Sequence, residues 1–298
     1  MKHHTQSPPA VIFVILFGLF MLLIFYNSNS RNEAFHYNAE TANLPLPSDL
    51  RKWGVKSGYR PASGNKTLDR HCGQCVIITS SSHVLGSKLG PLIDQAECII
   101  RMNDAPTTGY EADVGHRTTF RVVAHSSLFR VLRKPKEFVS KTPENILIFW
   151  GPEGRMKKSL FKVIQRASAA YPNMTAFVVS GNRLGQFDRL FKKETGKDRE
   201  TSRSWLSTGW FTMLISIELC DTIHVYGMIP ANYCSTQRPH SRKMAYHYYE
   251  PKGPDECVTY IHNEWSKRGY HHRFITEKRV FAKWASLYNI TFSHPSWN

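Results

Sequence analysis

The chain has 298 residues, which is long enough to build one large hydrophobic core. Hydrophobic residues make up 41% and charged residues 21%, and 12% are aromatic, so the composition excludes a disordered, collagen-like or coiled-coil protein. The 39 Lys and Arg residues outnumber the 23 Asp and Glu residues, and the formal net charge is +16. This charge predicts anionic partners, a class that includes nucleic acid, lipid head groups and small acidic substrates.

The N-terminal segment predicts a membrane anchor. Residues 11–26 carry no charge and are almost all bulky and apolar. Their number is at the low edge for a spanning helix and above the usual core of a signal peptide, so a cleaved signal peptide is the alternative. We favour the anchor, although Ser28 and Ser30 have the spacing of a cleavage site without its Ala-x-Ala form. Lys2 favours a cytosolic N-terminus, so residues 1–10 form a cytoplasmic tail and the chain after residue 26 lies in the lumen.

Glycosylation signals and cysteines agree with a lumenal domain. Asn65, Asn173 and Asn289 each begin an Asn-x-Ser/Thr sequon without Pro. The chain has 6 cysteines, an even number that an oxidising compartment would pair. The alternative is a zinc site at Cys72-x-x-Cys75, which we disfavour because no second close Cys/His pair follows.

The pattern along the chain predicts a stem and one α/β domain. Residues 27–66 are polar and rich in Asn, Ser and Pro, as in a stem, and we expect residues 67–298 to form the folded lumenal domain. Apolar, β-branched runs predict buried strands at residues 76–79, 98–101, 120–124, 146–150, 177–180 and 223–226. Amphipathic helices are predicted around residues 160–167 and 184–191. Such alternation predicts a largely parallel sheet that binds ligands at the carboxyl ends of its strands.

Polar loops follow the first two predicted strands. Thr79 to His83 form a small polar loop of the kind that binds nucleotides, or an ordinary turn. Asn103 follows the second strand, where it would bind a ribose or phosphate or cap the turn before Pro106. The chain has no Gly-x-Gly-x-x-Gly motif and no P-loop, which argues against a dinucleotide dehydrogenase or a P-loop enzyme. It also has no Asp-x-Asp pair, so we expect no bound metal.

An anion site is predicted at the start of the helix after residue 207. Ser207 has the character of an N-cap, and an apolar run follows it up to Leu219. The free amides at the start of such a helix, together with its dipole, favour a bound anion.

Four blocks in the chain resemble the sialyl motifs of eukaryotic sialyltransferases. The large motif is represented by residues 75–119, the small motif by 205–227, the third by His247-Tyr248-Tyr249-Glu250 and the fourth by His272-x4-Glu277. Within this family the sequence is similar to the N-acetylgalactosaminide α-2,6-sialyltransferases, and most to their short-stem, ganglioside-acting group. The chain departs from many family members at Ser80, where they carry Asn.

The resemblance implies a Rossmann-like glycosyltransferase domain of a GT-A variant type, anchored in the Golgi membrane as a single-pass type II protein. It implies transfer of sialic acid from CMP-N-acetylneuraminic acid, with inversion, to the 6-hydroxyl of GalNAc in sialylated glycolipids or glycoproteins. No cofactor is implied. Two alternatives are an inactive, membrane-anchored glycan- or polyanion-binding protein with this fold, and a nucleic-acid binder, which the anchor and sequons disfavour.

The resemblance also assigns site residues. His272 is the candidate general base, since the reference pKa of histidine lies near the working pH. His247 would contact the donor phosphate, with Tyr248 in support. The residue pattern of the last helix itself makes Thr276 a candidate N-cap. Glu277 either orients His272 or complements the dipole of that helix. The expected donor-binding residues are Ser80, Asn103, Ser207, Thr208, Gly209 and Gly227.

The resemblance implies one disulfide bond between Cys75 and Cys220. We expect Cys234–Cys257 and Cys72–Cys98 as the accompanying pairs.

Overall fold

The structure is a computed structural model that describes residues 50–53, 58–139, 141–143, 145–152, 156, 158–171, 174–236, 243–266 and 271–297. The predicted tail, the anchor, most of the predicted stem and the sequon at Asn173 lie outside these residues. Among the described helices, none has the length and apolar character needed to cross a membrane. The side chains of Asn65 and Asn289 are exposed.

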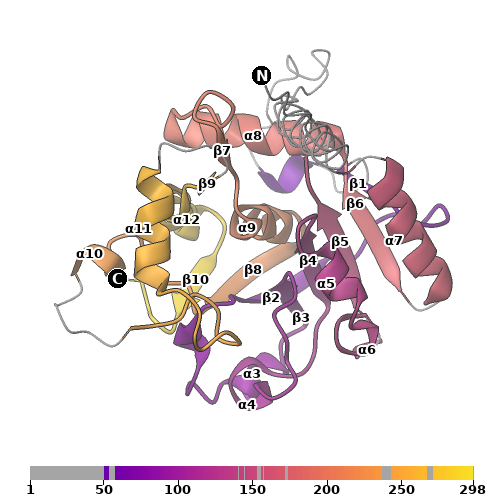
Figure 1. The fold of residues 1–298 in the computed structure, drawn as a ribbon, viewed down its shortest axis with the longest axis horizontal. Helices are drawn as coiled ribbons and strands as arrows, with labels where there is room; N and C mark the ends of the chain where they lie inside the picture. Colours follow the sequence, from indigo (N-terminus) through magenta and orange to yellow (C-terminus); the bar gives the residue numbers. More distant parts are fainter. Residues whose placement is uncertain are drawn as a thin grey trace, which may run out of the picture. The chain divides into compact units, whose positions relative to one another are not determined.

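The described chain forms an eight-stranded, mostly parallel sheet (Figure 1). Its strands are β1 (Tyr59–Pro61), β2 (Cys72–Ile78), β3 (Cys98–Met102), β4 (Phe120–Ala124), β5 (Ile146–Trp150), β6 (Thr175–Val179), β8 (Cys220–Tyr226) and β10 (Ile290–Ser293). Their order is β1-β6-β5-β4-β3-β2-β8-β10, and only β1 runs antiparallel to its neighbour. All six predicted strands are present, so the predicted α/β fold is confirmed.

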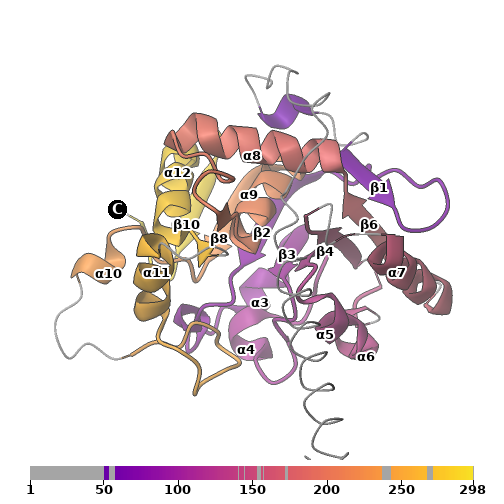
Figure 2. The same ribbon diagram turned by 45° about the horizontal axis from the view of Figure 1, so that its top comes forward.

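Helices cover both faces of the sheet, as the buried, apolar strands require. One face packs against α8 (Gly181–Thr195), α9 (Thr208–Leu219) and α12 (Phe274–Leu287). The other face packs against α3 (Gly90–Ile93), α4 (Glu111–Val114), α5 (Leu128–Leu132), α6 (Pro135–Phe138) and α7 (Lys158–Ala170). Helix α9 is buried almost all round, which explains its nearly uninterrupted apolar sequence. Two further helices, α10 (Tyr233–Thr236) and α11 (Glu256–Trp265), lie near α12 (Figure 2).

The folded domain begins earlier than residue 67, where we placed its boundary. Leu50, in the short 3-10 helix Leu50–Trp53, is a buried core residue. Tyr59 in β1 is also buried, and its hydroxyl donates to Glu218 of α9 at 2.9 Å. These apolar and hydrogen-bonded contacts join the end of the predicted stem to the folded domain.

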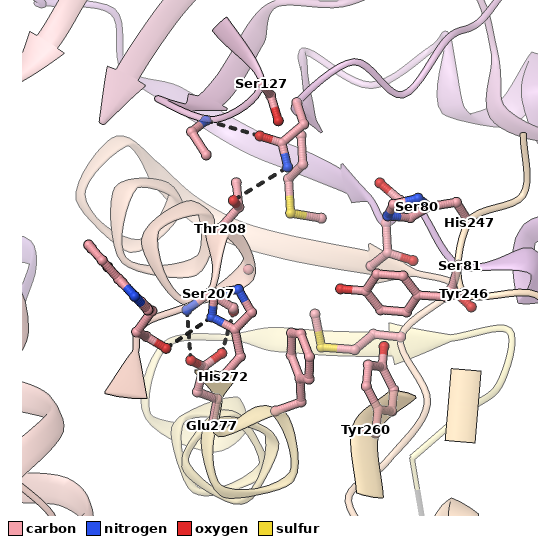
Figure 3. Close-up of a pocket in the computed structure, with 18 of the residues that line it drawn as sticks. Ser80, Ser81, Ser127, Ser207, Thr208, Tyr246, His247, Tyr260, His272 and Glu277 are labelled. Atoms are coloured by element: carbon pink, nitrogen blue, oxygen red, sulfur yellow. Dashed lines mark hydrogen bonds between the residues drawn. The ribbon is translucent and has the colours of Figure 1, made fainter. Parts of the chain in front are cut away.

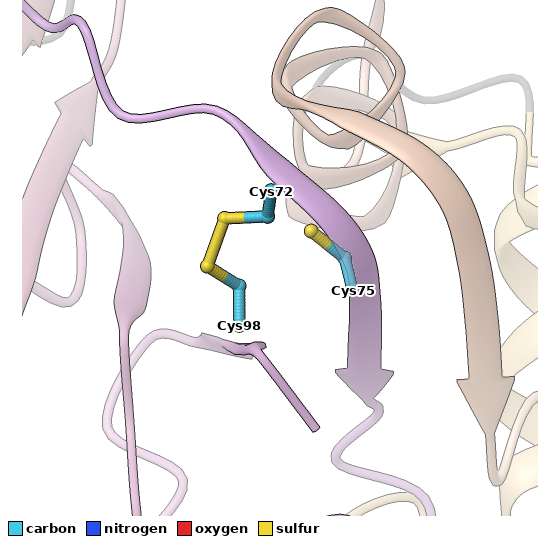
Figure 4. A group of neighbouring side chains, drawn as sticks. All are labelled: Cys72, Cys75 and Cys98. Atoms are coloured by element: carbon cyan, nitrogen blue, oxygen red, sulfur yellow. A yellow bond between two sulfur atoms is a disulfide. The ribbon is translucent and has the colours of Figure 1, made fainter.

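Three disulfide bonds hold the domain, in the pairs expected. They are Cys72–Cys98, Cys75–Cys220 and Cys234–Cys257. Figure 4 shows the Cys72–Cys98 bond beside the Cys75 side chain. Because all three of these sulfur atoms are in disulfides, none is a thiolate for zinc, and the alternative of a zinc site is wrong. The Cys75–Cys220 bond spans 145 residues, a separation at which the loop-entropy account predicts a stabilisation of about 4–5 kcal/mol.

The chain order of the strands reverses between β2 and β8. From β2 the sheet grows in one direction through β3, β4, β5 and β6, while β8 and β10 lie on the other side of β2. In open α/β sheets, ligands bind at the carboxyl ends of the strands beside such a reversal. The loops after β2 and β8 are therefore where a site is expected.

Candidate active site

A cavity of about 640 Å³ lies at that edge of the sheet (Figure 3). Its walls come from the ends of β2, β3, β4 and β8, the start of α9, the loop before α11 and the start of α12. Nine residues named from the sequence line it, namely Ser80, Asn103, Ser207, Thr208, Gly209, Gly227, His247, His272 and Glu277. Segments distant in the sequence therefore meet at one cavity.

Ser207 and Glu277 join the start of α9 to α12. The Ser207 amide donates to Glu277 Oε1 at 2.9 Å, and the other carboxyl oxygen is hydrogen-bonded to Ser207 Oγ. Ser207 Oγ also accepts from the Trp210 amide at 3.1 Å, as the predicted N-cap of α9. Burial raises the pKa of Glu277 to about 8, so this group is mostly protonated at pH 7. The contacts of Glu277 fix the start of α9 rather than the ring of His272.

Helix α12 is capped differently from our expectation. Arg273, not Thr276, occupies the N-cap position, and it makes no side-chain capping bond. Glu264 of α11 replaces that cap, because its Oε2 accepts from the amides of Ile275 and Thr276 at 3.0 and 3.1 Å. This carboxylate meets the amides of the first turn, where the helix dipole favours negative charge.

His272 lies in a short ladder that a second segment completes. It belongs to β9 (His271–His272), which pairs in parallel with β7 (Ser204–Trp205). His272 Nδ1 lies 3.0 Å from the main-chain oxygen of Trp205. A carbonyl oxygen only accepts, so Nδ1 carries the hydrogen and Nε2 keeps a free lone pair. Burial also lowers the pKa of His272 below 6.5, which favours the neutral ring. His271 is buried and does not line the cavity.

His247 lies on the other side of the cavity, as Figure 3 shows. Its Nδ1 is 2.7 Å from Glu250 Oε2, and its ring stacks on Tyr249 with centroids 4.9 Å apart. The carboxylate and the aromatic face fix the orientation of this imidazole. The ring is thereby fixed at the cavity wall, where a ligand can contact it.

Asn103 connects three elements at the cavity edge. Its Oδ1 accepts from the Ala124 amide at 2.9 Å, and its Nδ2 donates to Thr208 Oγ1 at 3.4 Å. The backbone of Asn103 has φ 48°, a conformation that Asn tolerates better than most residues. The second hydrogen of its amide group is left for a ligand. Asn103 therefore fits both predicted roles, as a turn residue and as a ligand-binding residue.

Gly227 permits a close approach between the loops after β2 and β8. Its φ is +84°, and a Cβ there would lie 2.4 Å from Val84 Cγ1 and 2.6 Å from Thr79 Oγ1. No other residue fits this position without moving both neighbours. The predicted donor-site glycine therefore shapes the cavity.

Tyr248 lies behind the cavity rather than in its wall. Its hydroxyl donates to the main-chain oxygen of Pro106, and its amide donates to the oxygen of Ser80 at 2.8 Å. It therefore holds together the loops that carry Ser80 and Asn103. This geometry fits the supporting role expected from the sequence.

Sequence reasoning missed Lys278, which also lines the cavity. Its side chain is buried, its Nζ has no hydrogen-bond partner, and Nζ lies 3.6 Å from the centroid of the Tyr260 ring. Burial lowers the pKa of Lys278 to about 7. Neighbouring Glu256 accepts from Tyr260 at 2.6 Å and from Ser81 Oγ at 2.8 Å. The one signal in the sequence was its place directly after Glu277 of the fourth motif.

Comparison with known proteins places the chain in a family. Residues 55–286 match glycosyltransferase family 29 (sialyltransferase). The chain belongs to this family. All four motif blocks fall within the matched range, so this comparison confirms the resemblance seen in the sequence.

Individual relatives are also named as sialyltransferases. Alpha-N-acetylgalactosaminide alpha-2,6-sialyltransferase 6 of Bos taurus is 65% identical over 300 residues, which cover 100% of this chain and 90% of that protein. The Homo sapiens protein of that name is 65% identical over 98% of this chain and 89% of its own length. These identities agree with the resemblance of the motif blocks to the N-acetylgalactosaminide α-2,6-sialyltransferases. Alpha-N-acetylgalactosaminide alpha-2,6-sialyltransferase 3 of Mus musculus is 43% identical over 87% of this chain and 85% of its own length.

A solved structure shares the fold. The crystal structure of a mammalian sialyltransferase matches with a TM-score of 0.50 and 20% identity, over 88% of this chain and 87% of that one. The mixed α/β architecture is therefore that of known sialyltransferases.

Proposed function

We propose that this sialyltransferase transfers sialic acid from CMP-N-acetylneuraminic acid, with inversion, to the 6-hydroxyl of GalNAc. Sialylated glycolipids are the proposed acceptors, and O-glycans a second class. The observation that carries the proposal is a neutral His272 in the wall of a cavity that is also lined by the start of α9. The names of the relatives support the linkage and the GalNAc acceptor.

The proposed reaction is a direct displacement. The acceptor oxygen attacks C2 of the sialyl group, the bond from C2 to the phosphate oxygen breaks, and CMP leaves with that electron pair. His272 takes the acceptor proton on Nε2, because its Nδ1 hydrogen is held by Trp205. An attack from the face opposite the leaving group inverts the configuration.

The departing phosphate gains negative charge during this step. The free amides at the start of α9 and the ring of His247 line the cavity and can stabilise this charge. Arg130 adds a cation to the wall, and Lys278, whose pKa burial lowers to about 7, adds a second positive charge below that pH. Arg130 is positioned by Asp104, which accepts from its Nε at 2.7 Å.

We propose that this step needs no metal ion. The divalent metal ions that assist glycosyl transfer, such as Mg²⁺ and Mn²⁺, bind best to paired carboxylate oxygens. Among the described residues that line the cavity, Glu277 is the single carboxyl group, and Ser207 already occupies both of its oxygens.

We also propose that the protein is a single-pass type II protein of the Golgi membrane, with the domain in the lumen. Residues 11–26 would form the anchor. Three disulfide bonds suit an oxidising compartment, and the exposed Asn65 and Asn289 are accessible for glycosylation.

The direct test incubates the full chain with CMP-sialic acid and a panel of sialylated glycolipids, O-glycans and their desialylated forms. We expect CMP release that depends on a GalNAc-containing acceptor, and linkage analysis should identify the 6-hydroxyl as the site. His272→Ala is the control. An acceptor that binds without CMP release would favour the inactive glycan-binding protein instead.

A further inference from the structure

Helix α11 buries polar side chains toward the domain. Glu256, Tyr260 and Glu264 follow one another at intervals of four residues, and all three are buried. Both inward carboxyl groups are hydrogen-bonded. Glu256 accepts from Ser81 Oγ beside the cavity, and Glu264 accepts from two amides at the start of α12. The polar inner face is thus explained by the active site and by the capping of α12.

The outer face of the same helix is apolar. Val258, Ile261 and Trp265 are exposed to 64%, 43% and 76%, and their spacing of three and four residues places them on one face. We call these three residues the α11 face. An ordinary surface helix has the reverse arrangement, with its apolar stripe turned inward. Nothing in the part of the domain that the structure describes accounts for this face, and clustered exposed apolar side chains typically mark a contact surface.

A second cavity, of about 980 Å³, continues the α11 face. Ile261 and Trp265 line it together with side chains of α12 and β10. Lys197 and Arg279 add two exposed cations to its wall. Among its described lining residues the one carboxyl group is that of Glu264, which is buried, accepts from amides of α12 and lies 3.8 Å from Lys197 Nζ. Arg279 therefore leaves this apolar region with an excess of accessible positive charge.

We propose that the α11 face docks on a lipid surface, the membrane that carries the acceptor glycolipid. The apolar side chains would enter the interfacial layer, for which Trp is well suited, and Lys197 and Arg279 would meet acidic head groups. Tyr260 on the inner side of α11 lines the active-site cavity, so docking leaves about one helix diameter, ~10 Å, between the lipid surface and that cavity. This inference rests on the proposed glycolipid acceptor.

The test compares one acceptor glycan in two forms. The full chain is reconstituted into phosphatidylcholine and phosphatidylserine vesicles that contain a sialylated, GalNAc-bearing glycolipid, or it is given the same glycan free in solution. The triple variant Val258→Ser, Ile261→Ser, Trp265→Ser should lose about tenfold in kcat/KM on the vesicle acceptor and stay within twofold on the free glycan. The matched control is Leu92→Ser, since Leu92 is an equally exposed residue of α3, at 53%.

Equal losses on both forms, or no loss on vesicles, would overturn the docking surface. If the wild type modifies neither form, the proposed function itself has failed. A second readout is independent of activity. Vesicles of phosphatidylcholine brominated on the acyl chains should quench more fluorescence from the wild type than from Trp265→Phe, and equal quenching would contradict docking. Sedimentation that shows a wild-type dimer and a monomeric triple variant would assign the face to a second copy of the chain and overturn the lipid proposal.

Discussion

The Nδ1 atom of His272 donates a hydrogen bond to the main-chain oxygen of Trp205, 3.0 Å away. Trp205 lies three residues before the start of α9, so the same short segment orients the proposed base and leads into the proposed anion site. One displacement of this segment would disturb proton transfer and leaving-group stabilisation together.

Replacing His272 tests the base. We expect His272→Ala to lower turnover by roughly 10²- to 10⁴-fold, the usual loss for a positioned proton acceptor, with little change in the affinity for CMP. Turnover, CMP affinity and melting temperature should be measured on the same preparation. A near-normal turnover would remove His272 from the mechanism, and a parallel loss of all three quantities would reduce it to a structural residue.

His247→Ala serves as the contrasting variant within this prediction. Because His247 is proposed to contact the phosphate, its loss should weaken CMP binding as well as turnover. Unchanged CMP affinity in His247→Ala would separate this residue from the donor.

The pH dependence of kcat/KM gives a second prediction. Burial lowers the pKa of His272 below 6.5, so in a mildly acidic lumen the base is less protonated than an ordinary histidine would be. We expect kcat/KM to fall only as the pH drops below 6.5, since protonation then removes the Nε2 lone pair. The measurement is kcat/KM from pH 4.5 to 7.5, which reports the ionisation of the free enzyme. A decline centred above pH 6.5 would contradict this prediction.

The sheet was predictable from the sequence because its central strands are continuous apolar runs, such as the one ending at Trp150. The N-cap role of Ser207 was also predictable, because it depends only on a hydrogen bond from the Trp210 amide to the Ser207 hydroxyl, three residues apart in the chain. The roles of Glu277 and Lys278 were not, because their environments depend on α9 and α11 in the folded domain. The sequence also did not reveal that Tyr59 belongs to the folded domain, because its hydrogen-bond partner Glu218 lies 159 residues away in the chain.

Glu277 offers a third prediction, on stability. Burial raises its pKa from 4.5 to about 8, so the folded protein keeps a proton that the unfolded chain releases above pH 4.5. The free energy of unfolding contributed by this group therefore falls as the pH rises from 4.5 toward 8. Glu277→Gln keeps acceptor and donor atoms for Ser207 but cannot titrate.

We therefore expect the melting temperature of Glu277→Gln, relative to the wild type, to increase between pH 4.5 and 7. Glu277→Ala is the matched variant that removes both hydrogen bonds to Ser207, and it should be less stable than the wild type throughout. A pH-independent difference between Glu277→Gln and the wild type would show that Glu277 is ionised in the folded domain.

Metal removal gives a fourth prediction. Since Glu277 is the single carboxyl group among the described lining residues of the cavity, dialysis against EDTA should leave the transfer rate within about twofold to threefold. Buffer without EDTA is the control. A loss of activity that manganese restores would require a metal-dependent step.

The fifth prediction concerns Lys278, whose ammonium group is buried without a hydrogen-bond partner. Burying a charge without a hydrogen bond costs more stability than the contact with the Tyr260 ring returns, so Lys278→Met should raise the melting temperature. If the amine instead binds an anionic group of the donor, the same variant should raise the KM for CMP-sialic acid by roughly ten- to hundredfold, the expected loss for a hydrogen bond to a charged group. Lys283→Met is the matched control, because Lys283 is exposed on the same helix.

The pH dependence of the donor KM distinguishes binding from packing. With a pKa of about 7 in the free enzyme, Lys278 loses its charge as the pH rises above 7, so the wild-type KM for the donor should increase from pH 6 to 8. In Lys278→Met the KM should be high and change little over this range. Lys278 is charged below about pH 7, which favours donor binding. His272 is neutral above its lowered pKa, which favours proton transfer. Both conditions hold only between these two limits. A Lys278→Met enzyme that is more stable yet keeps the wild-type KM at pH 6 would exclude the amine from the donor site.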